Sequence, residues 1–499
     1  MRLLLLGLLL TILAVPAIAQ VAQEEGTSSG TAIQPIEPAG HTPPSDAPSD
    51  RVGRFSLVSG NVSVRISEKW LDGELNFPLA TGASVRTGQR GHAEIEIGAD
   101  TIELTPESEI EITRLDDRAI RVGVVRGQIR FALRRLGDGE GVGVDIAGEN
   151  IPLLQPEHYE IDAGSGVVAV STEGTRSDFD ETRLAAPYYI SPDVTGFTAL
   201  DASGTWESTS QYGIVWIPSG VPPDWAPYRD GHWRWILPWG WTWIDDQPWG
   251  FATAHYGRWT IVDEHWGWVP GSFVEHPVFV PAVVAFLGTA GVGLSVADAA
   301  GPAIAWFPLA PGEVYWPSYT RNLDYVRNLN LGNIADVSVI QLDPNGDPPL
   351  EVFHEHFANR RFAGVVPRRV FRNGGAVAPA LLSLPEQRLL NAPVLMGSPQ
   401  IGPPETLVAA APAATKQPNP RSVWTNRIAA LVARGINRAK ALQTAHAQLR
   451  VREPVARLDD GHLRVPAYAK SSPRHTILLR VAHEGPPPAH GGAGKVARH

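Results

Sequence analysis

Residues that interrupt helices recur along the whole chain, and they constrain its fold more than any other feature. The 499 residues include 49 glycines and 44 prolines, together well above the combined average of about 12%. Breakers at this frequency disfavour long helices and favour short strands, turns and linkers. At about 150 residues per domain, the length allows roughly three domains. We therefore expect a mainly β protein with more than one domain.

The first 19 residues have the organisation of a secretory signal peptide. Arg2 provides the positive charge, the run from Leu3 to Val15 is apolar, and Ala17-Ile18-Ala19 offers small residues for cleavage. The apolar run is shorter than the roughly 20 residues that cross a bilayer, although an uncleaved anchor is the competing interpretation. Because the chain has no cysteine, we do not expect a lipoprotein. We expect a periplasmic or secreted protein that begins near Gln20, with a disordered linker over 20–50.

Positive charge is concentrated in the C-terminal part of the chain. From Lys416 to the end there are 15 lysines and arginines and 4 acidic residues, whereas the whole chain has a net charge of −10. We expect a linker over 401–420, an amphipathic helix over 421–450 and a basic disordered tail over 451–499. Two interpretations stay open, an arm that contacts an anionic surface and a solvated terminus without a partner. Nucleic acid is not an expected partner of an exported protein.

Residues 51–172 alternate between apolar and polar side chains as strands do. Val62, Val64 and Ile66 lie on one side of the chain, and Ile95 and Ile97 alternate with glutamates. Glycines punctuate these short runs, and half of each run is charged. This pattern predicts a small β-sandwich or β-roll with one solvent-facing surface. A connector over 173–205 follows it.

The order of motifs in this block resembles the FecR-type domain. The motifs are Gly60-Asn61-Val62, Leu79 to Gly88, Ala93 to Ile97, Ile102 to Leu104 and Val125 to Ile129. The resemblance implies a periplasmic domain, which in sensor proteins lies outside a membrane helix and a cytoplasmic anti-sigma segment. This chain has neither ahead of the domain, so the resemblance does not imply transmembrane sigma-factor regulation.

Twelve of the sixteen tryptophans lie between Trp206 and Trp268, in a block that we expect to span 206–400. Gly231-His232-Trp233 leads to Trp239-Gly240-Trp241, and Gly257-Arg258-Trp259 leads to Trp266-Gly267-Trp268. The offsets of 26 and 27 residues indicate a duplicated unit with one residue inserted. The alternation of aromatic and polar residues predicts an antiparallel hairpin in each copy. If Trp235 lies opposite Trp241, then Trp233 lies opposite Trp243, and the four indoles share a face.

Ten residues of this block are candidates for ligand binding. Indoles on a flat ribbon with a polar rim suit the faces of sugar rings or proline-rich peptides. The candidates are Trp233, Trp235, Trp241, Trp243, Tyr256, Trp259, Trp266, Trp268, Arg234 and Arg258. The alternative is that the indoles form the core of a small β domain, since each ring buries about 150–250 Å².

The motifs of the tryptophan-rich block also resemble those of a known family. They are Tyr212 to Pro218, Trp225 to Trp233, Pro238 to Trp243, His255 to Trp259 and Trp306 to Leu309. They are similar to an uncharacterised family of bacterial exported proteins in which this domain directly follows a FecR-type domain. Since the function of that family is unknown, the resemblance implies an architecture and no mechanism.

Few patterns point to catalysis or to a metal. The absence of cysteine excludes disulfides, thiolate metal sites and cysteine nucleophiles. His354-Glu355-His356 provides two imidazoles, but zinc takes four ligands and no third is close in the sequence. Asp245-Asp246 and Asp263-Glu264 form the acid pair of a glycosidase only if two carboxylates face each other across a cleft. There is no nucleophile elbow, phosphate loop or dinucleotide fingerprint, so we expect no catalytic residue, metal or cofactor.

A second apolar stretch runs from Val278 to Val296. It contains Pro281 and the glycines 288, 291 and 293. These residues favour a strand, a turn and a second strand, with a membrane helix as the alternative.

These features predict an exported, non-catalytic cell-envelope protein. It would bind or scaffold through its aromatic-rich β domain, with a cell-wall glycan or an envelope protein as the ligand. The alternative is a regulatory module in envelope signalling that acts by protein contact through the first block. A hydrolase is a third hypothesis. The sequence does not indicate an oligomeric state.

Overall fold

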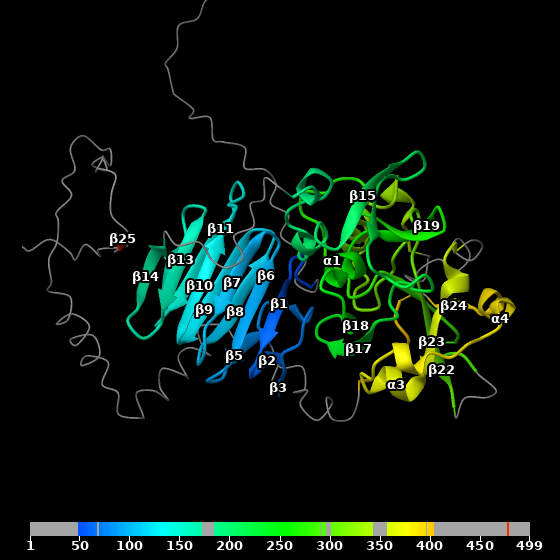
Figure 1. Cartoon of the computed structure of the whole chain (residues 1–499), viewed down its shortest axis with the longest axis horizontal. Coiled ribbons are helices and arrows are strands. Elements are labelled where there is room, and N and C mark those ends of the chain that lie inside the picture. Colours follow the sequence, from blue (N-terminus) through cyan, green and yellow to red (C-terminus); the bar gives the residue numbers. More distant parts are fainter. Residues whose placement is uncertain are drawn as a thin grey trace, which may run out of the picture. The chain divides into compact units, whose positions relative to one another are not determined.

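The computed structural model describes most of the chain between residues 48 and 403 (Figure 1). The described ranges are 48–66, 69–171, 184–289, 291–295, 301–342, 357–395, 397–403 and 477–478. The expected signal peptide (1–19), nearly all of the 20–50 linker, most of the 401–420 linker and the 421–450 helix lie outside them, as does the 451–499 tail apart from 477–478. The described residues are mainly β, which confirms the expected fold class.

Residues 48–171 form the first block, which consists of two sheets. One sheet has the strand order β25-β14-β13-β10-β7-β6-β1-β4, and the other has the order β12-β11-β9-β8-β5-β2-β3. Neighbouring strands are antiparallel except for β9 and β11, which are parallel. The strands are β1 Gly53–Ser59, β2 Val62–Ile66, β3 Lys69–Asp72, β4 Pro78–Leu79, β5 Ser84–Thr87, β6 His92–Ile97, β7 Asp100–Leu104, β8 Glu109–Asp116, β9 Ala119–Arg126, β10 Gln128–Leu133, β11 Gly141–Ile146, β12 Glu149–Pro152, β13 Glu157–Asp162, β14 Val167–Ser171 and β25 Ile477–Leu478.

The alternation in the sequence explains why these two sheets form a sandwich. In β8, Ile110 and Ile112 are fully buried, while Glu109 and Glu111, which alternate with them, are only partly covered. Ile95 and Phe131 from the first sheet share one core with Ile112 from the second. Each strand therefore directs its apolar side to the interior and its charged side to solvent.

Residues 184–403 form the second block, in which short sheets alternate with short helices (Figure 1). Its sheets have the orders β15-β16-β20-β19, β17-β18 and β23-β22-β21-β24. The strands are β15 Gly204–Thr209, β16 Gly213–Pro218, β17 Gly231–Ile236, β18 Gly240–Asp245, β19 Arg258–Val262, β20 His265–Val269, β21 Val284–Leu287, β22 Ala303–Pro308, β23 Gly364–Pro367 and β24 Val394–Leu395. The α-helices are α1 Gly250–His255, α2 Leu323–Asn330, α3 Arg368–Arg372 and α4 Glu386–Asn391. The 3-10 helices are η2 Ala186–Tyr188, η3 Phe197–Ala199, η4 Val337–Val339, η5 Arg360–Phe362 and η6 Ala378–Ala380.

Both predicted hairpins are present, and the first has the predicted pairing. In β17 and β18, Trp233 lies opposite Trp243 and Trp235 lies opposite Trp241. In β19 and β20, Trp259 lies opposite Trp268. The two copies differ in their surroundings, because β20 also pairs with β16 whereas β17 and β18 form a sheet of their own.

Two other expectations can be compared with the structure. Residues 184–205, expected as part of a connector, carry η2 and η3 and place Phe197 and Leu200 in the core. The apolar stretch from Val278 contains β21 and then a tight turn closed by Thr289 and Gly293, as predicted. The second strand of the prediction is reduced to a single bridge between Leu294 and Ala303. Among the described residues, no helix is both long and apolar enough to cross a membrane.

Candidate functional site

The indoles of the two hairpins are buried in the interior of the second block. Trp243 and Trp268 are 0% exposed, and Trp233, Trp241 and Trp259 are at most 2% exposed. The rings meet mainly edge to face, as in the pair of Trp233 and Trp306, whose centroids are 5.3 Å apart with planes at 81°. This geometry is the favoured one for aromatic pairs, and it makes the indoles a packed cluster.

Most indole N–H groups of this cluster donate to the protein's own oxygens. Burial requires such a partner, because an unpaired polar group in the interior is costly. The donor–acceptor pairs are Trp216 to Leu200 O (3.0 Å), Trp241 to Ile401 O (2.9 Å), Trp243 to Asp245 Oδ2 (2.9 Å), Trp259 to Thr253 O (3.0 Å) and Trp268 to Tyr256 O (2.9 Å). Two of these pairs, those of Trp259 and Trp268, connect the second hairpin to the end of α1.

The ten sequence candidates do not share one open surface. Eight are buried, namely Trp233, Trp241, Trp243, Tyr256, Trp259, Trp266, Trp268 and Arg258. Trp235 is partly exposed on the first hairpin, and Arg234 beside it is exposed. The burial agrees with the alternative interpretation, in which the indoles form the core of the domain.

Arg258 holds the second hairpin against helix α2. Its Nη2 donates to Asn330 Oδ1 at 2.8 Å, and its Nε donates to the carbonyl oxygen of Glu313 at 3.0 Å. Burial lowers the pKa of the guanidinium to about 10. The side chain therefore acts as a packing residue with neutral acceptors, since no carboxylate of the described residues lies within ion-pair distance of it.

Asp245 ends the first hairpin and serves the packing of the indoles. Its carboxylate accepts from Trp243 Nε1 and from the backbone N–H of Gln247, both at 2.9 Å. Burial raises the pKa of this carboxyl to about 7. Its neighbour Asp246 is exposed, so the adjacent pair does not face a common cleft. Asp263 and Glu264 form the turn between β19 and β20, with positive φ angles of 46° and 68°.

The first and second blocks are joined by a buried asparagine that the sequence did not single out. Asn76 Nδ2 donates to the carbonyl oxygens of Asp245 (2.8 Å) and Gln247 (2.7 Å), and its Oδ1 accepts from Arg54 at 2.6 Å. Arg54 also donates to the carbonyl of Pro248 at 2.8 Å and pairs with Glu96. Because these partners are far apart in the chain, no local pattern could have indicated the contact.

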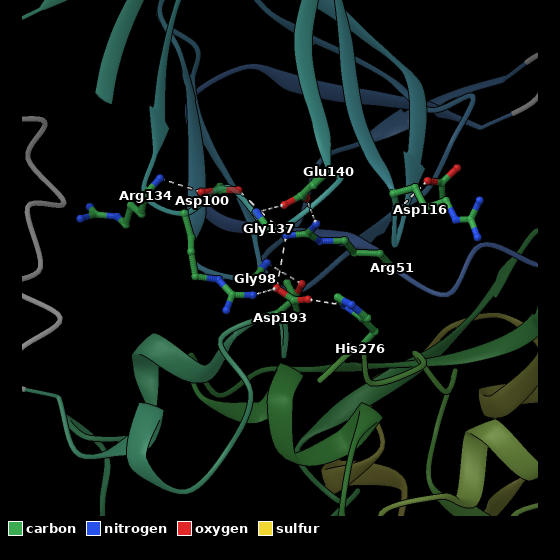
Figure 2. A network of polar contacts seen from close by, with 12 residues as sticks. Arg51, Gly98, Asp100, Asp116, Arg134, Gly137, Glu140, Asp193 and His276 are labelled. Carbon is green, nitrogen blue, oxygen red and sulfur yellow. Dashed lines mark hydrogen bonds and ion pairs between the residues drawn. The ribbon is translucent and has the colours of Figure 1, made fainter. Parts of the chain in front are cut away.

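A second part of the same junction is a cluster of charges around Arg51 (Figure 2). Arg51 pairs with Glu140 at 2.5 Å, with Asp193 at 3.6 Å and with Asp100 at 4.0 Å. Asp193 of the second block also bonds His276 Nδ1 at 2.9 Å. Burial raises the pKa of Asp100 to about 7, although backbone N–H groups and Arg51 oppose the shift. The pKa of Arg51 is raised because the three carboxylates outweigh its own burial.

Among the described residues, the histidines of the second block do not form a metal centre. His255 is fully buried between Phe251 and Phe279, and burial lowers its pKa to about 3, so the ring is neutral. His232 lies 3.2 Å from Glu74 of the first block, and His265 is exposed in β20. His354 and His356 lie outside the described residues. Over the described part of the chain, no group of three potential ligands is close enough to hold an ion.

A cavity of about 60 Å³ lies beside the end of α1. It is lined by His255, by the loop around Phe273, and by Leu329 at the end of α2. Three of the ten sequence candidates, Tyr256, Arg258 and Trp268, also border it. Its size suits a few water molecules rather than a sugar ring.

Comparison with known sequences finds a family match for part of the second block. Residues 197–313 match a family described as a family of unknown function (DUF6600). The match covers both tryptophan hairpins and supports the resemblance of the tryptophan-rich block to an uncharacterised family. It does not extend over 51–172, where the FecR-type resemblance stays a prediction. No curated protein and no solved structure matches the chain.

Proposed function

We propose that this is an exported, non-catalytic protein of the cell envelope that binds or scaffolds an envelope protein through its aromatic-rich β domain. The observation that carries the proposal is the burial of the indoles. A glycan platform requires flat ring faces open to solvent, whereas eight of the ten candidate residues are covered. The aromatic cluster is better suited to a scaffold that meets a protein partner through its strand edges, its loops and the rings that a loop covers.

The acidic side chains near the hairpins support a non-catalytic role. Asp245 is engaged by an indole and a backbone N–H, and Asp246 points into a different environment. A glycosidase requires two carboxyls that face each other about 5–10 Å apart across the substrate. The carboxylate of Asp245 serves the fold instead.

Export is part of the proposal and rests on residues 1–19. Their charge, apolar run and small residues have the order of a cleavable leader. Expression of the full gene with a C-terminal tag, followed by fractionation and mass measurement, tests it. We expect a product in the periplasm or medium that begins near Gln20. An intact product in the cytoplasmic fraction contradicts export.

The ligand class is tested with two binding experiments on the purified mature chain. In the first, the protein is sedimented with purified cell-wall sacculi and titrated with soluble sugars while tryptophan fluorescence is recorded. In the second, the tagged protein is crosslinked to its neighbours in intact cells through lysines. We expect a discrete protein adduct, and no sedimentation or sugar-dependent change in fluorescence. Sedimentation together with sugar quenching would instead establish a glycan-binding protein.

A second candidate function, a regulatory module in envelope signalling, is favoured by the first block. Its two-sheet sandwich agrees with the FecR-type resemblance of residues 51–172. Among the described residues, only Ile477 and Leu478 pair with the outer edge of strand β14. The rest of that edge offers backbone groups to a strand of another protein. Deletion of residues 167–171 should abolish a regulatory contact but leave a contact made by the second block.

A further inference from the structure

The segment Gly397–Pro403 lies against the indoles of the first hairpin. The N–H of Trp241 donates to the carbonyl oxygen of Ile401 at 2.9 Å. Ile401 is 3% exposed and belongs to the same core as Trp233 and Trp241. A second contact joins the hydroxyls of Ser398 and Ser318, which are 2.7 Å apart. Both ends of the segment are therefore fixed to the block.

The chemistry of this contact is that of peptide recognition. The segment reads Ser398-Pro399-Gln400-Ile401-Gly402-Pro403, with a proline on each side of the anchoring residue. Prolines restrict the backbone before binding, and aromatic grooves commonly recognise such segments. The N–H of Ile401 donates to the carbonyl oxygen of Pro399 at 2.7 Å. This tight turn orients the carbonyl oxygen of Ile401 towards the indole N–H of Trp241.

The segment fills its site incompletely. A cavity of about 10 Å³ remains between the segment, at Gly397 and Ser398, and the side chains of Trp233, Trp239 and Trp241. Trp233 and Trp239 border this cavity, and their indole nitrogens are buried without a hydrogen-bond partner in the described structure. The space is about that of a single water molecule. Of the three tryptophans that border the cavity, only Trp241 donates to the segment.

The position of the segment in the chain allows it to leave without breaking a strand. It follows β24, which ends at Leu395, and no strand or helix of the described structure lies between 397 and 403. Its attachments to the block are the two polar contacts above, the buried side chains of Pro399 and Ile401, and the packing of Gly397 against Ser318. Gly397 itself has a φ of +79° and lies within 3.1–3.3 Å of Ser318, so a side chain there would disturb the fit.

We propose that Trp233, Trp239 and Trp241 form a peptide-binding groove, and that Ser398–Pro403 is its resident intramolecular ligand. The segment detaches locally, and an extended proline-containing segment of a partner then takes its place. The resident segment leaves the indole N–H groups of Trp233 and Trp239 without a hydrogen-bond partner. A partner segment with more hydrogen-bond acceptors accepts from both of them. This inference rests on the proposed function, because it names the class of protein segment that the aromatic-rich domain binds.

Local detachment is tested on the unaltered mature chain by hydrogen exchange of its indole N–H groups, followed by NMR. Trp241 and Trp268 form a matched pair, since both are buried and both donate to a backbone carbonyl at 2.9 Å. Tryptophan-to-phenylalanine variants assign the two signals. We expect the Trp241 indole to exchange at least 100-fold faster than that of Trp268, because only the former opens without unfolding. Equal exchange rates would overturn the proposal.

Replacement of the resident ligand is tested with Ile401→Ala and a peptide of residues 397–403. We expect the peptide to bind the variant at least tenfold more tightly than the unaltered protein and to return the Trp241 indole signal towards its original position. The peptide with alanine in place of isoleucine should not bind, and Leu390→Ala, which removes an exposed aliphatic side chain, should behave as the unaltered protein. Absence of peptide binding to a folded variant refutes the groove.

If Ile401→Ala does not fold, Ser398→Ala replaces it, because this change removes the hydroxyl contact with Ser318 and keeps the Trp241 indole that reports peptide binding. The exchange experiment involves no partner. A failure to capture an envelope protein would therefore count against the proposed function, whereas equal exchange rates would count against the resident ligand.

Discussion

Asp100 shows how one buried carboxyl makes the stability of this protein depend on pH. It is 2% exposed, and burial raises its pKa from 3.8 to about 7. Between those two values the native state keeps a proton that the unfolded chain gives up. The free energy of unfolding therefore falls as the pH rises from about 4 to about 7.

We predict that Asp100→Asn removes this dependence. Asparagine does not titrate, and its oxygen can still accept from the backbone N–H of Arg134, which lies 2.8 Å from the carboxylate. We compare the free energy of unfolding of the variant with that of the unaltered protein at each pH. The difference, variant minus unaltered, should increase by at most about 4 kcal/mol between pH 4 and pH 8. Denaturant unfolding at several pH values measures it. Asp324→Asn, at a side chain that is 85% exposed, is the control. A stability difference that is constant over this pH range would refute the prediction.

Residue pairing within each hairpin could be predicted from the sequence, but the environment of those residues could not. The opposition of Trp233 and Trp243 follows from alternation and the length of the turn, both of which are local. Their burial depends on Phe286, Trp306 and Phe371, which approach from distant parts of the chain. An amphipathic ribbon looks the same in sequence whether its aromatic face meets a ligand or another sheet. For that reason eight of the ten residues predicted as ligand-binding candidates lie in the core.

At the scale of elements, the second hairpin requires glycine at position 257, because the indole of Trp268 packs directly against its backbone. Gly257 has a φ of +63°, and an added Cβ would lie 2.6 Å from both Trp268 Nε1 and the carbonyl oxygen of Val269. The strand β19 begins at the next residue, so the glycine sets where the hairpin starts. A side chain here would separate the two strands or displace the indole.

We predict that Gly257→Ala destabilises the protein by about 3 kcal/mol, the sum of backbone strain and steric conflict. Gly213→Ala is a matched control, because Gly213 has a similar φ of +70° at a strand start but has no atom within 4 Å of an added Cβ. That control should lose only about 1 kcal/mol. Chemical denaturation followed by tryptophan fluorescence measures both. Equal losses would show that packing around Trp268 does not limit the substitution.

At the scale of the molecule, the sequence predicts two β blocks, and the structure shows that they share contacts. The block boundaries follow from composition, since alternating strands give way to a tryptophan-rich region. The junction consists instead of single residues such as Asn76, Arg54 and Arg51, each within an ordinary strand or turn. Contacts of this kind, between residues far apart in the chain, produce no periodic pattern in the sequence. They nevertheless determine whether the blocks unfold separately or together.

We predict that the blocks unfold together and that Asn76→Gly uncouples them. The side chain of Asn76 makes two hydrogen bonds to the second block and one to Arg54, and its loss leaves buried groups unpaired at about 1–3 kcal/mol each. Glycine tolerates the φ of 61° found at this position, so the change isolates the side chain. Glu107→Gly, at an exposed residue of the first block with a φ of 60°, is the control.

The distribution of tryptophan supplies the measurement of this coupling. In residues 51–171 the only tryptophan is Trp70, so intrinsic fluorescence reports chiefly on the second block. Hydrogen exchange of peptides from β6 to β10 reports on the first block. The two midpoints of denaturation should coincide in the unaltered protein and in Glu107→Gly, and should separate in Asn76→Gly. If they also coincide in Asn76→Gly, the Arg51 cluster or other contacts suffice to couple the blocks, and Asn76 is not the residue that joins them.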